Sequence, residues 1–268
     1  MLKLYYAANT CALASHIILE ESGAPYETVR LDFAKNDQKS ADYVAVNPKA
    51  RVPALATEHG VLTETPAILA YLAQIFPAAK FAPADAWNFA RAQAFNSYLC
   101  STVHVAHAHK GRGARWTDDA AAMETFKKKV PQNMTDCYTL MEASMFAGPW
   151  VMGADFGICD AYLFTVSRWL EGDGVDISLF PGISGHFQRM LARPAVQRVL
   201  AQHTRGATPA RIGRPHAGQE GGCAGNQLGS TRSSSSPPST FCSVNTLCGR
   251  SAMLSFRHQS IRSSSCGE

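Results

Sequence analysis

The sequence predicts a small α/β domain, an all-helical second domain and a disordered C-terminal tail. Residues 1–76 alternate short strand patterns with helical patterns in the order β-α-β-α-β-β-α. Residues 86–203 show helical periodicity, and residues 77–85 form a linker rich in Pro and Ala. Ser, Gly, Arg and Pro dominate residues 204–268, where no apolar periodicity remains. A chain of 268 residues with 46% apolar content can bury a sizeable core.

The first domain reads as a parallel β-α-β unit followed by a helix, two short strands and a final helix. The predicted elements are strand 2–6, helix 11–21, strand 26–32, helix 41–46, strands 54–57 and 61–63, and a helix with an apolar face over 67–75. Gly23 and Pro25 end the first helix, and Pro48 ends the second.

The second domain is predicted to contain two long helices and three shorter ones. The apolar spacing gives helices over 85–107, 117–145, 158–170, 186–191 and 195–202. Pro131 lies inside the second of these and is expected to bend it, whereas Pro194 is well placed to open the last.

The positive charge of the chain is concentrated in the tail. The formal net charge is +4, and residues 204–268 contain seven Arg against two acidic residues, which leaves the first 203 residues close to neutral. The folded domains therefore give no indication of a nucleic-acid partner, and an RNA-binding role for the Arg- and Ser-containing tail is the less favoured interpretation.

No secretory signal or membrane-spanning run is present, and the eight Cys show no zinc or disulfide spacing, so we expect a cytoplasmic protein with reduced thiols, no metal and no membrane partner.

Four segments carry a specific family resemblance. They are Tyr5-Tyr-Ala-Ala-Asn-Thr-Cys11-Ala-Leu-Ala-Ser-His16, Val46-Asn-Pro-Lys-Ala-Arg-Val52-Pro53-Ala-Leu55, Leu62-Thr-Glu64-Thr65-Pro-Ala-Ile68 and Val151-Met-Gly-Ala-Asp-Phe-Gly157-Ile-Cys-Asp160-Ala-Tyr162. In this order they resemble the catalytic loop, cis-proline turn, γ-glutamyl-binding turn and buried helix-capping segment of the glutathione S-transferase superfamily, nearest to its bacterial beta-like classes. The resemblance covers residues 1–202 and implies a thioredoxin-like first domain, glutathione as co-substrate and a homodimer.

Cys11 is the candidate sulfur-site residue. It stands at the predicted start of a helix, where free N–H groups and the helix dipole favour an anion, so we expect a lowered thiol pKa. By resemblance, Cys11 contacts the glutathione sulfur and can form a mixed disulfide with it. Tyr6 is the second catalytic candidate, because the resemblance places it near that sulfur and its hydroxyl can donate to a thiolate. Since neighbouring strand residues face opposite sides, only one of Tyr5 and Tyr6 can reach the site, and Tyr6 is preferred.

Two turns are expected to hold the tripeptide. By resemblance, the Val52-Pro53 peptide is cis, and the Val52 backbone pairs with the cysteinyl part of glutathione. Glu64 and Thr65 precede the last helix of the domain, where Thr65 and nearby N–H groups can bind the γ-glutamyl carboxylate while Glu64 accepts the ammonium group. Read without the family, the same two residues are a helix N-cap.

Cations near the site are the remaining candidates. Arg51 and Lys35 are possible partners for the glycyl carboxylate, although a solvated charge is the simpler interpretation of each. By resemblance, His109 and Lys110 face the sulfur, with His107 as the competitor. His109 lies five and two residues after His104 and His107, offsets that do not place all three on one helix face, so a metal site is not expected.

The predicted activity is transfer of the glutathione thiol to a small hydrophobic electrophile held between the domains. Thiol–disulfide exchange is an alternative, although no second Cys lies two residues after Cys11 as in a dithiol motif. A non-catalytic ligand- or partner-binding protein is the other alternative. Asp160, three residues after Gly157, is interpreted as a structural capping residue.

Overall fold

The computed structural model describes residues 1–204. The predicted disordered tail, 204–268, lies outside the described residues except for Thr204. The first domain has the predicted order: β1 (Leu2–Tyr6), α1 (Ala12–Ser22), β2 (Tyr26–Arg30), α2 (Ala41–Val46), β3 (Ala54–Thr57), β4 (Gly60–Thr63) and α3 (Thr65–Ile75). The strands form one sheet in the order β2-β1-β3-β4, in which β1 and β2 are parallel and β3 is antiparallel to both β1 and β4.

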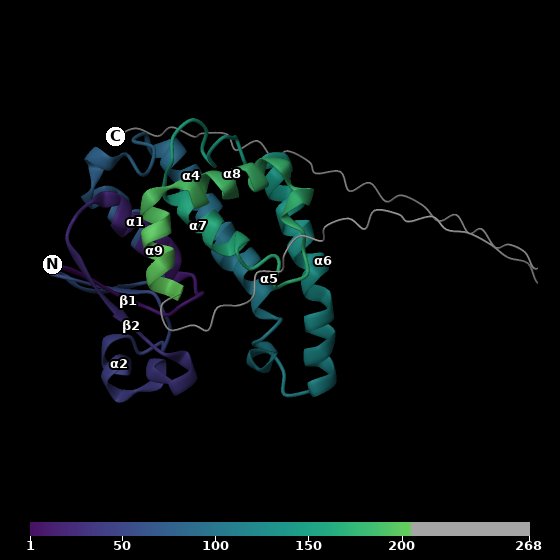
Figure 1. Ribbon diagram of the computed structural model, residues 1–268. Coiled ribbons are helices and arrows are strands. Elements are labelled where there is room, and N and C mark those ends of the chain that lie inside the picture. Colours follow the sequence, from purple (N-terminus) through teal and green to yellow (C-terminus); the bar gives the residue numbers. More distant parts are fainter. Residues whose placement is uncertain (205–268) are drawn as a thin grey trace, which may run out of the picture. The chain divides into compact units, whose positions relative to one another are not determined.

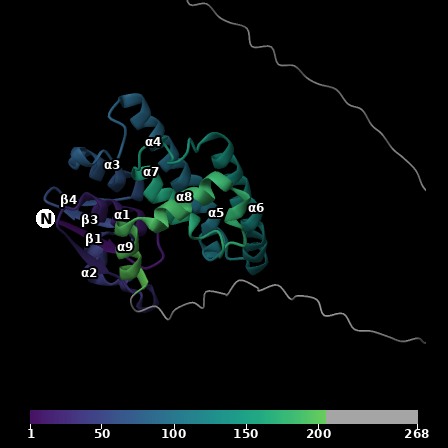
Figure 2. The ribbon, with the colours of Figure 1, turned by 45° about the horizontal axis from the view of Figure 1, so that its top comes forward.

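The sheet separates two sets of helices. Figures 1 and 2 place α2 on one side of the sheet and α1 on the other. The two tyrosines at the end of β1 follow this division, because Tyr5 packs against Tyr43 of α2 and Tyr6 packs against His16 of α1. The end of β1 therefore directs one ring to each side of the sheet.

The helical domain follows the predicted order with shifted boundaries. Its elements are α4 (Ala86–Tyr98), a π-helical turn (Leu99–Val103), α5 (His104–Ala108), α6 (Ala120–Ser144), α7 (Ile158–Ser167), α8 (Pro181–Ala192) and α9 (Pro194–Thr204). Short 3₁₀ helices cover Phe33–Lys35, Asp37–Lys39, Pro77–Ala79, Gly113–Arg115 and Ile177–Leu179. The predicted helix over 85–107 is thus three consecutive helical segments, and α8 begins five residues earlier than predicted because Pro181 can occupy a first helical turn.

One apolar core joins the two domains. Helix α1 is buried along most of its length and packs against α3 of its own domain and against α7 and α9 of the helical domain. Leu4, Ile17, Leu72 and Phe164 are completely buried in this core, and burial of each such side chain is worth roughly 1.5–3 kcal/mol. The shared core fixes the walls of any cavity formed where the domains meet.

Asp160 connects the start of α7 to its surroundings, as predicted for a structural residue. Its buried carboxylate accepts hydrogen bonds from the backbone N–H groups of Val151 at 2.8 Å and Gly157 at 2.7 Å. The Nε2 atom of His186 lies 3.0 Å from the same carboxylate. One side chain therefore ties the loop before α7, the first turn of α7 and helix α8 together.

Candidate functional site

A cavity of about 640 Å³ is lined by both domains. The first domain contributes six of the ten predicted site residues, which are Cys11, Arg51, Val52, Pro53, Glu64 and Thr65. The helical domain contributes Cys100, His104, His107, Arg112, Arg115, Trp116 and Trp169, among others. The residues chosen from the first-domain motifs are thus brought together, whereas Cys100, Arg112 and Arg115 of the helical wall were not predicted.

The Cys11 thiol lies at the N-terminus of α1 and donates a hydrogen bond to the Val52 carbonyl at 3.5 Å. Burial raises the pKa of Cys11, while a hydrogen bond with Thr65 and the positive charge of Arg112 act in the opposite direction. The prediction of a lowered thiol pKa is therefore wrong for the free protein. The sequence showed the helix start but not the loss of hydration, which here outweighs it. Cys11 is accordingly a neutral thiol donor at neutral pH.

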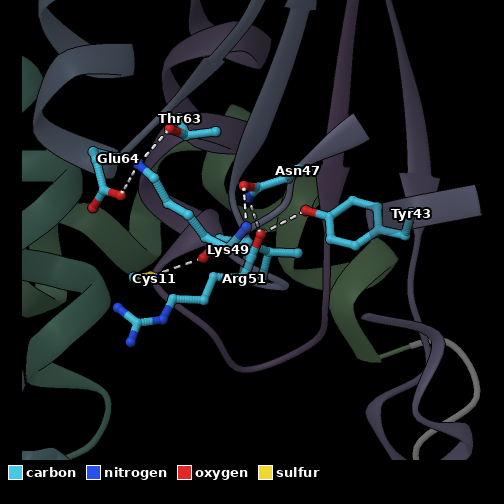
Figure 3. Close-up of polar contacts among 8 residues, drawn as sticks. Cys11, Tyr43, Asn47, Lys49, Arg51, Thr63 and Glu64 are labelled. Carbon is cyan, nitrogen blue, oxygen red and sulfur yellow. Dashed lines mark hydrogen bonds and ion pairs between the residues drawn. The ribbon is translucent and has the colours of Figure 1, made fainter. Parts of the chain in front are cut away.

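Two side chains hold the turn before Pro53, one from Tyr43 in α2 and one from Asn47, which directly follows α2. The Tyr43 hydroxyl and the Asn47 Nδ2 both donate to the Arg51 carbonyl, at 2.6 and 2.7 Å. Asn47 is almost fully buried, and its Oδ1 accepts the Lys49 backbone N–H at 3.1 Å. The Val52–Pro53 peptide is cis, as predicted. Figure 3 shows these donors converging on Arg51, whose side chain extends on the side where Cys11 lies.

Glu64 and Thr65 stand where β4 meets α3. Glu64 has a φ of 72°, a conformation that costs of order 1–3 kcal/mol in a residue other than Gly and is concentrated at functional sites. Its side chain makes no capping hydrogen bond and instead contacts Lys49 Nζ at 2.6 Å, which also reaches the Thr63 hydroxyl at 2.9 Å (Figure 3). The simple N-cap interpretation therefore does not account for the Glu64 side chain, whose carboxylate remains half-exposed.

Tyr6 is not among the residues that line this cavity. Its ring is buried against His16 and His203, with centroid separations of 5.0 and 4.7 Å, and burial raises the pKa of Tyr6. As predicted, Tyr5 and Tyr6 face opposite sides of the sheet. The Tyr6 side chain, however, lies in the core between α1 and α9. The structure thus does not support the assignment of Tyr6 to the sulfur site.

His109 and Lys110 also lie outside the cavity lining. His109 stacks on Trp116 with a centroid separation of 4.1 Å, and the Lys110 ammonium lies 3.5 Å from the buried carboxylate of Asp173. His104 and His107 line the cavity instead, because residues three apart share one face of a helix. The preference for the His109–Lys110 pair came from the family's adjacent His and Lys, but both residues follow the end of α5, and Lys110 contacts Asp173 instead.

The two cavity histidines have different surroundings. His107 Nδ1 lies 2.7 Å from Asp173 Oδ2, and the His107 ring stacks on Trp169 at 4.3 Å. Burial lowers the pKa of His104 to about 4, and the charge of Arg112 contributes in the same direction. His104 is therefore a neutral imidazole at neutral pH and has little power as a base.

Lys35 is not among the residues that line the cavity, whereas Lys39 is. Lys35 is largely exposed and lies 3.7 Å from Asp32 in a surface ion pair. The solvated-charge interpretation therefore fits Lys35, while Arg51 lines the cavity as one of the proposed carboxylate partners.

Cys100, Arg112 and Arg115 were missed by the sequence reasoning. Cys100 lies in the π-helical turn Leu99–Val103, and such turns are frequent at functional sites, but their position is not evident from apolar spacing. The available signal for the arginines was the group Arg112, Arg115 and Trp116 directly after the histidine-containing helix.

Within residues 1–204, none of the helices combines the length and apolarity required to cross a bilayer. The same range contains no group of three or more His, Cys, Asp or Glu side chains arranged to hold a metal ion.

Comparisons with known proteins agree with this architecture. Residues 1–74 match the family model for the glutathione S-transferase N-terminal domain. The chain is 34% identical over 203 residues to glutathione S-transferase GstA of Escherichia coli O157:H7, covering 75% of this chain and 98% of that protein. Among solved structures it resembles a glutathione transferase homologue from Sulfitobacter with bound glutathione, with 44% identity, a TM-score of 0.73 and coverage of 75% and 98% of the two chains.

A beta-class relative adds to this agreement. The glutathione S-transferase of Sphingomonas chungbukensis, described as a bacterial beta-class enzyme, is 29% identical with a TM-score of 0.65, covering 75% of this chain and 98% of that one. The match spans nearly the whole of GstA, and the family model covers nearly all of the first domain. The chain belongs to the glutathione S-transferase superfamily.

Proposed function

We propose that this protein is a glutathione transferase that joins the glutathione thiol to a small hydrophobic electrophile. The observation that carries the proposal is the convergence of Cys11, Val52, Glu64 and Thr65 on one cavity. These residues offer a thiol, an extended backbone segment and a polar helix start within a single binding site. Relatives named as glutathione S-transferases and a related structure with bound glutathione support the same activity.

Glutathione is proposed to bind along the first-domain wall. Its γ-glutamyl carboxylate would meet Thr65 and the free N–H groups of α3, and its ammonium would join the Glu64 carboxylate beside Lys49. The cysteinyl segment would pair with the Val52 backbone, which the two hydrogen bonds to the Arg51 carbonyl hold in place. This pose puts the glutathione sulfur next to Cys11.

The neutral Cys11 thiol suits a donor role toward the glutathione thiolate. Because burial keeps Cys11 protonated, its S–H group can donate to the bound thiolate instead of repelling it. The thiol proton of glutathione leaves to solvent, and the nearby positive charges of Arg51 and Arg112 stabilise the resulting anion. The sulfur then forms a bond to the electrophilic carbon, whose leaving group departs with the bonding electron pair.

Thiol–disulfide exchange is a second candidate because two cysteines line the same cavity. Cys100 comes from the helical domain and faces the cavity that Cys11 borders from the first domain. The absence of a second Cys two residues after Cys11 therefore does not exclude a pair of thiols at this cavity. In this activity a glutathione mixed disulfide on Cys11 would be cleaved by a second thiol, with release of reduced glutathione.

A conjugation assay with 1-chloro-2,4-dinitrobenzene tests the proposed transfer and separates it from exchange. The wild type is expected to conjugate glutathione, and Cys11→Ala is expected to lose about tenfold or more in kcat/KM, as for removal of one transition-state hydrogen-bond donor. Cys100→Ala is the matched control and should retain conjugation. Conjugation by Cys11→Ala at the wild-type kcat/KM would contradict the role given to Cys11, and retained disulfide reduction in the same variant would contradict the exchange mechanism.

The assembly and location remain part of the proposal. By family resemblance we propose a cytoplasmic homodimer that acts in detoxification. Light scattering of the full chain at micromolar concentration tests the dimer, for which the expected mass is twice the 28.9 kDa of one chain.

A further inference from the structure

The helical wall of the cavity carries two arginines without acidic partners. Arg112 and Arg115 follow α5 and line the cavity, and within residues 1–204 neither guanidinium forms an ion pair. Burial lowers the pKa of Arg115, and the positive charges of Arg112 and Arg51 add to that effect. Three like charges therefore face one space, an arrangement that an anion would relieve.

The charges around the cavity exceed what glutathione alone would neutralise. Among the described lining residues there are four cations, Lys39, Arg51, Arg112 and Arg115, against one carboxylate, that of Glu64. Lys49 already contacts Glu64. Glutathione carries two carboxylates and one ammonium, and the thiolate of the bound form brings its net charge to about −2. Its γ-glutamyl end is assigned to Glu64 and Thr65, so its glycyl carboxylate and its thiolate balance only part of the charge of the four cations.

The same wall offers flat apolar surfaces. Trp116 is 45% exposed and Val105 is 37% exposed, and both line the cavity. Trp169 also lines it and is held by stacking on His107. A planar conjugated compound would cover these surfaces, and aromatic faces with nearby guanidinium groups bind planar anions well.

We propose that the preferred second substrate is an anionic electrophile, a planar aromatic or conjugated compound that bears a carboxylate. Arg112 and Arg115 hold the carboxylate, and the ring lies against Trp116 with its electrophilic carbon toward the glutathione sulfur. The inference rests on the proposed transferase function and specifies its substrate class. For a chloroarene, the sulfur–carbon bond forms, the carbon–chlorine bond breaks, chloride leaves with the electron pair and the thiol proton passes to solvent.

The test compares 4-chloro-3,5-dinitrobenzoate with its methyl ester, which has the same reactive carbon but no charge. For each substrate, kcat/KM is divided by the second-order rate constant of the uncatalysed reaction with glutathione, because the ester is intrinsically more reactive. The carboxylate-to-ester ratio of these values is expected to exceed one in the wild type. Arg112→Gln and Arg115→Gln should each lower that ratio, and the double variant should lower it by about tenfold or more. Arg91→Gln, an exposed α4 residue outside the cavity lining, is the matched control and should keep the wild-type ratio.

Three outcomes overturn the inference. A wild-type ratio at or below one shows that the charge is not recognised. If the arginine variants raise the KM for glutathione with both substrates and leave the carboxylate-to-ester ratio unchanged, the two arginines bind the glycyl carboxylate instead. Conjugation of neither substrate by the wild type removes the proposed function as well, whereas conjugation of the ester with no preference for the carboxylate removes the substrate class alone.

Discussion

The Cys11 thiol donates to the carbonyl of Val52 at 3.5 Å, so the sulfur that begins α1 is joined to the turn that precedes Pro53. A thiolate could not make this contact, because it has no proton to donate. The hydrogen bond and the burial of Cys11 both favour the neutral thiol in the free protein.

Alkylation of Cys11 by iodoacetamide is expected to accelerate with pH above the ordinary thiol pKa of about 8.5. The reactive species is the thiolate, and burial raises the pKa of Cys11, so its population at neutral pH is small. Peptide mass spectrometry follows the labelling of Cys11 separately from Cys100. A reaction rate that is already at its plateau below pH 7 would show that a thiolate exists in the free protein.

Tyr43→Phe is expected to raise the KM for glutathione severalfold and to lower the free energy of unfolding by about 1 kcal/mol. The change removes one of the two donors to the Arg51 carbonyl and leaves the Asn47 donor in place. Tyr71→Phe removes a hydroxyl elsewhere in the first domain and is the control. Equal effects of the two substitutions on the KM would contradict the positioning role of Tyr43.

Buried histidines should make the protein less stable in acid. His16 Nδ1 lies 3.1 Å from His203 Nε2, and burial lowers the pKa of His16 to about 4 and that of His203 to about 3. Both depressed pKa values mean that the unfolded chain binds protons first as the pH falls below about 6.5. The contribution of the neutral pair to the free energy of unfolding is therefore complete above that pH. It declines from there toward pH 4 and below, by about 1.4 kcal/mol per pH unit for each histidine.

Urea unfolding of the wild type and of His203→Gln between pH 7 and pH 4.5 measures this effect. In His203→Gln, the free energy of unfolding should fall less steeply as the pH decreases, by the contribution of one histidine. His59→Gln, at an exposed position, should keep the wild-type dependence on pH. An unfolding free energy that does not change over this range would contradict the neutral state of the pair.

Asp160→Ala is expected to lower the free energy of unfolding by roughly 3 kcal/mol. The substitution removes the acceptor of the Val151 and Gly157 N–H groups and leaves both without that partner. Asp176→Ala removes an exposed capping carboxylate and should cost only about 1 kcal/mol. Urea midpoints of the two variants give the comparison, and equal losses would argue against the buried network.

The first domain was predictable because its elements and its motifs are local. Strand and helix periods gave the order of elements, and the turn at Val52-Pro53 and the Glu64-Thr65 pair are contiguous segments that the fold brings to one cavity. Alternation along β1 correctly separated Tyr5 from Tyr6, but alternation does not say which face borders a cavity and which borders α9. The distant contact with His203 decided that question.

The helical wall was harder to predict for a different reason. His104 and His107 share a helix face by spacing, but the identity of the face depends on the π-helical turn that precedes α5. The pKa of Cys11 depends on the side chains that exclude water around it, which come from several separate segments. Neither the direction of that helix face nor the pKa of Cys11 can therefore be derived from a short stretch of sequence.

Isothermal titration calorimetry of the full chain with glutathione tests the central claim most directly. The wild type is expected to bind with a dissociation constant below about 1 mM, a modest binding free energy of roughly −4 kcal/mol or better. Glu64→Gln, which removes the negative charge proposed to pair with the ammonium group, should weaken binding by about tenfold, a loss within the range for a hydrogen bond to a charged group. No heat of binding from the folded wild type at millimolar glutathione would contradict the account.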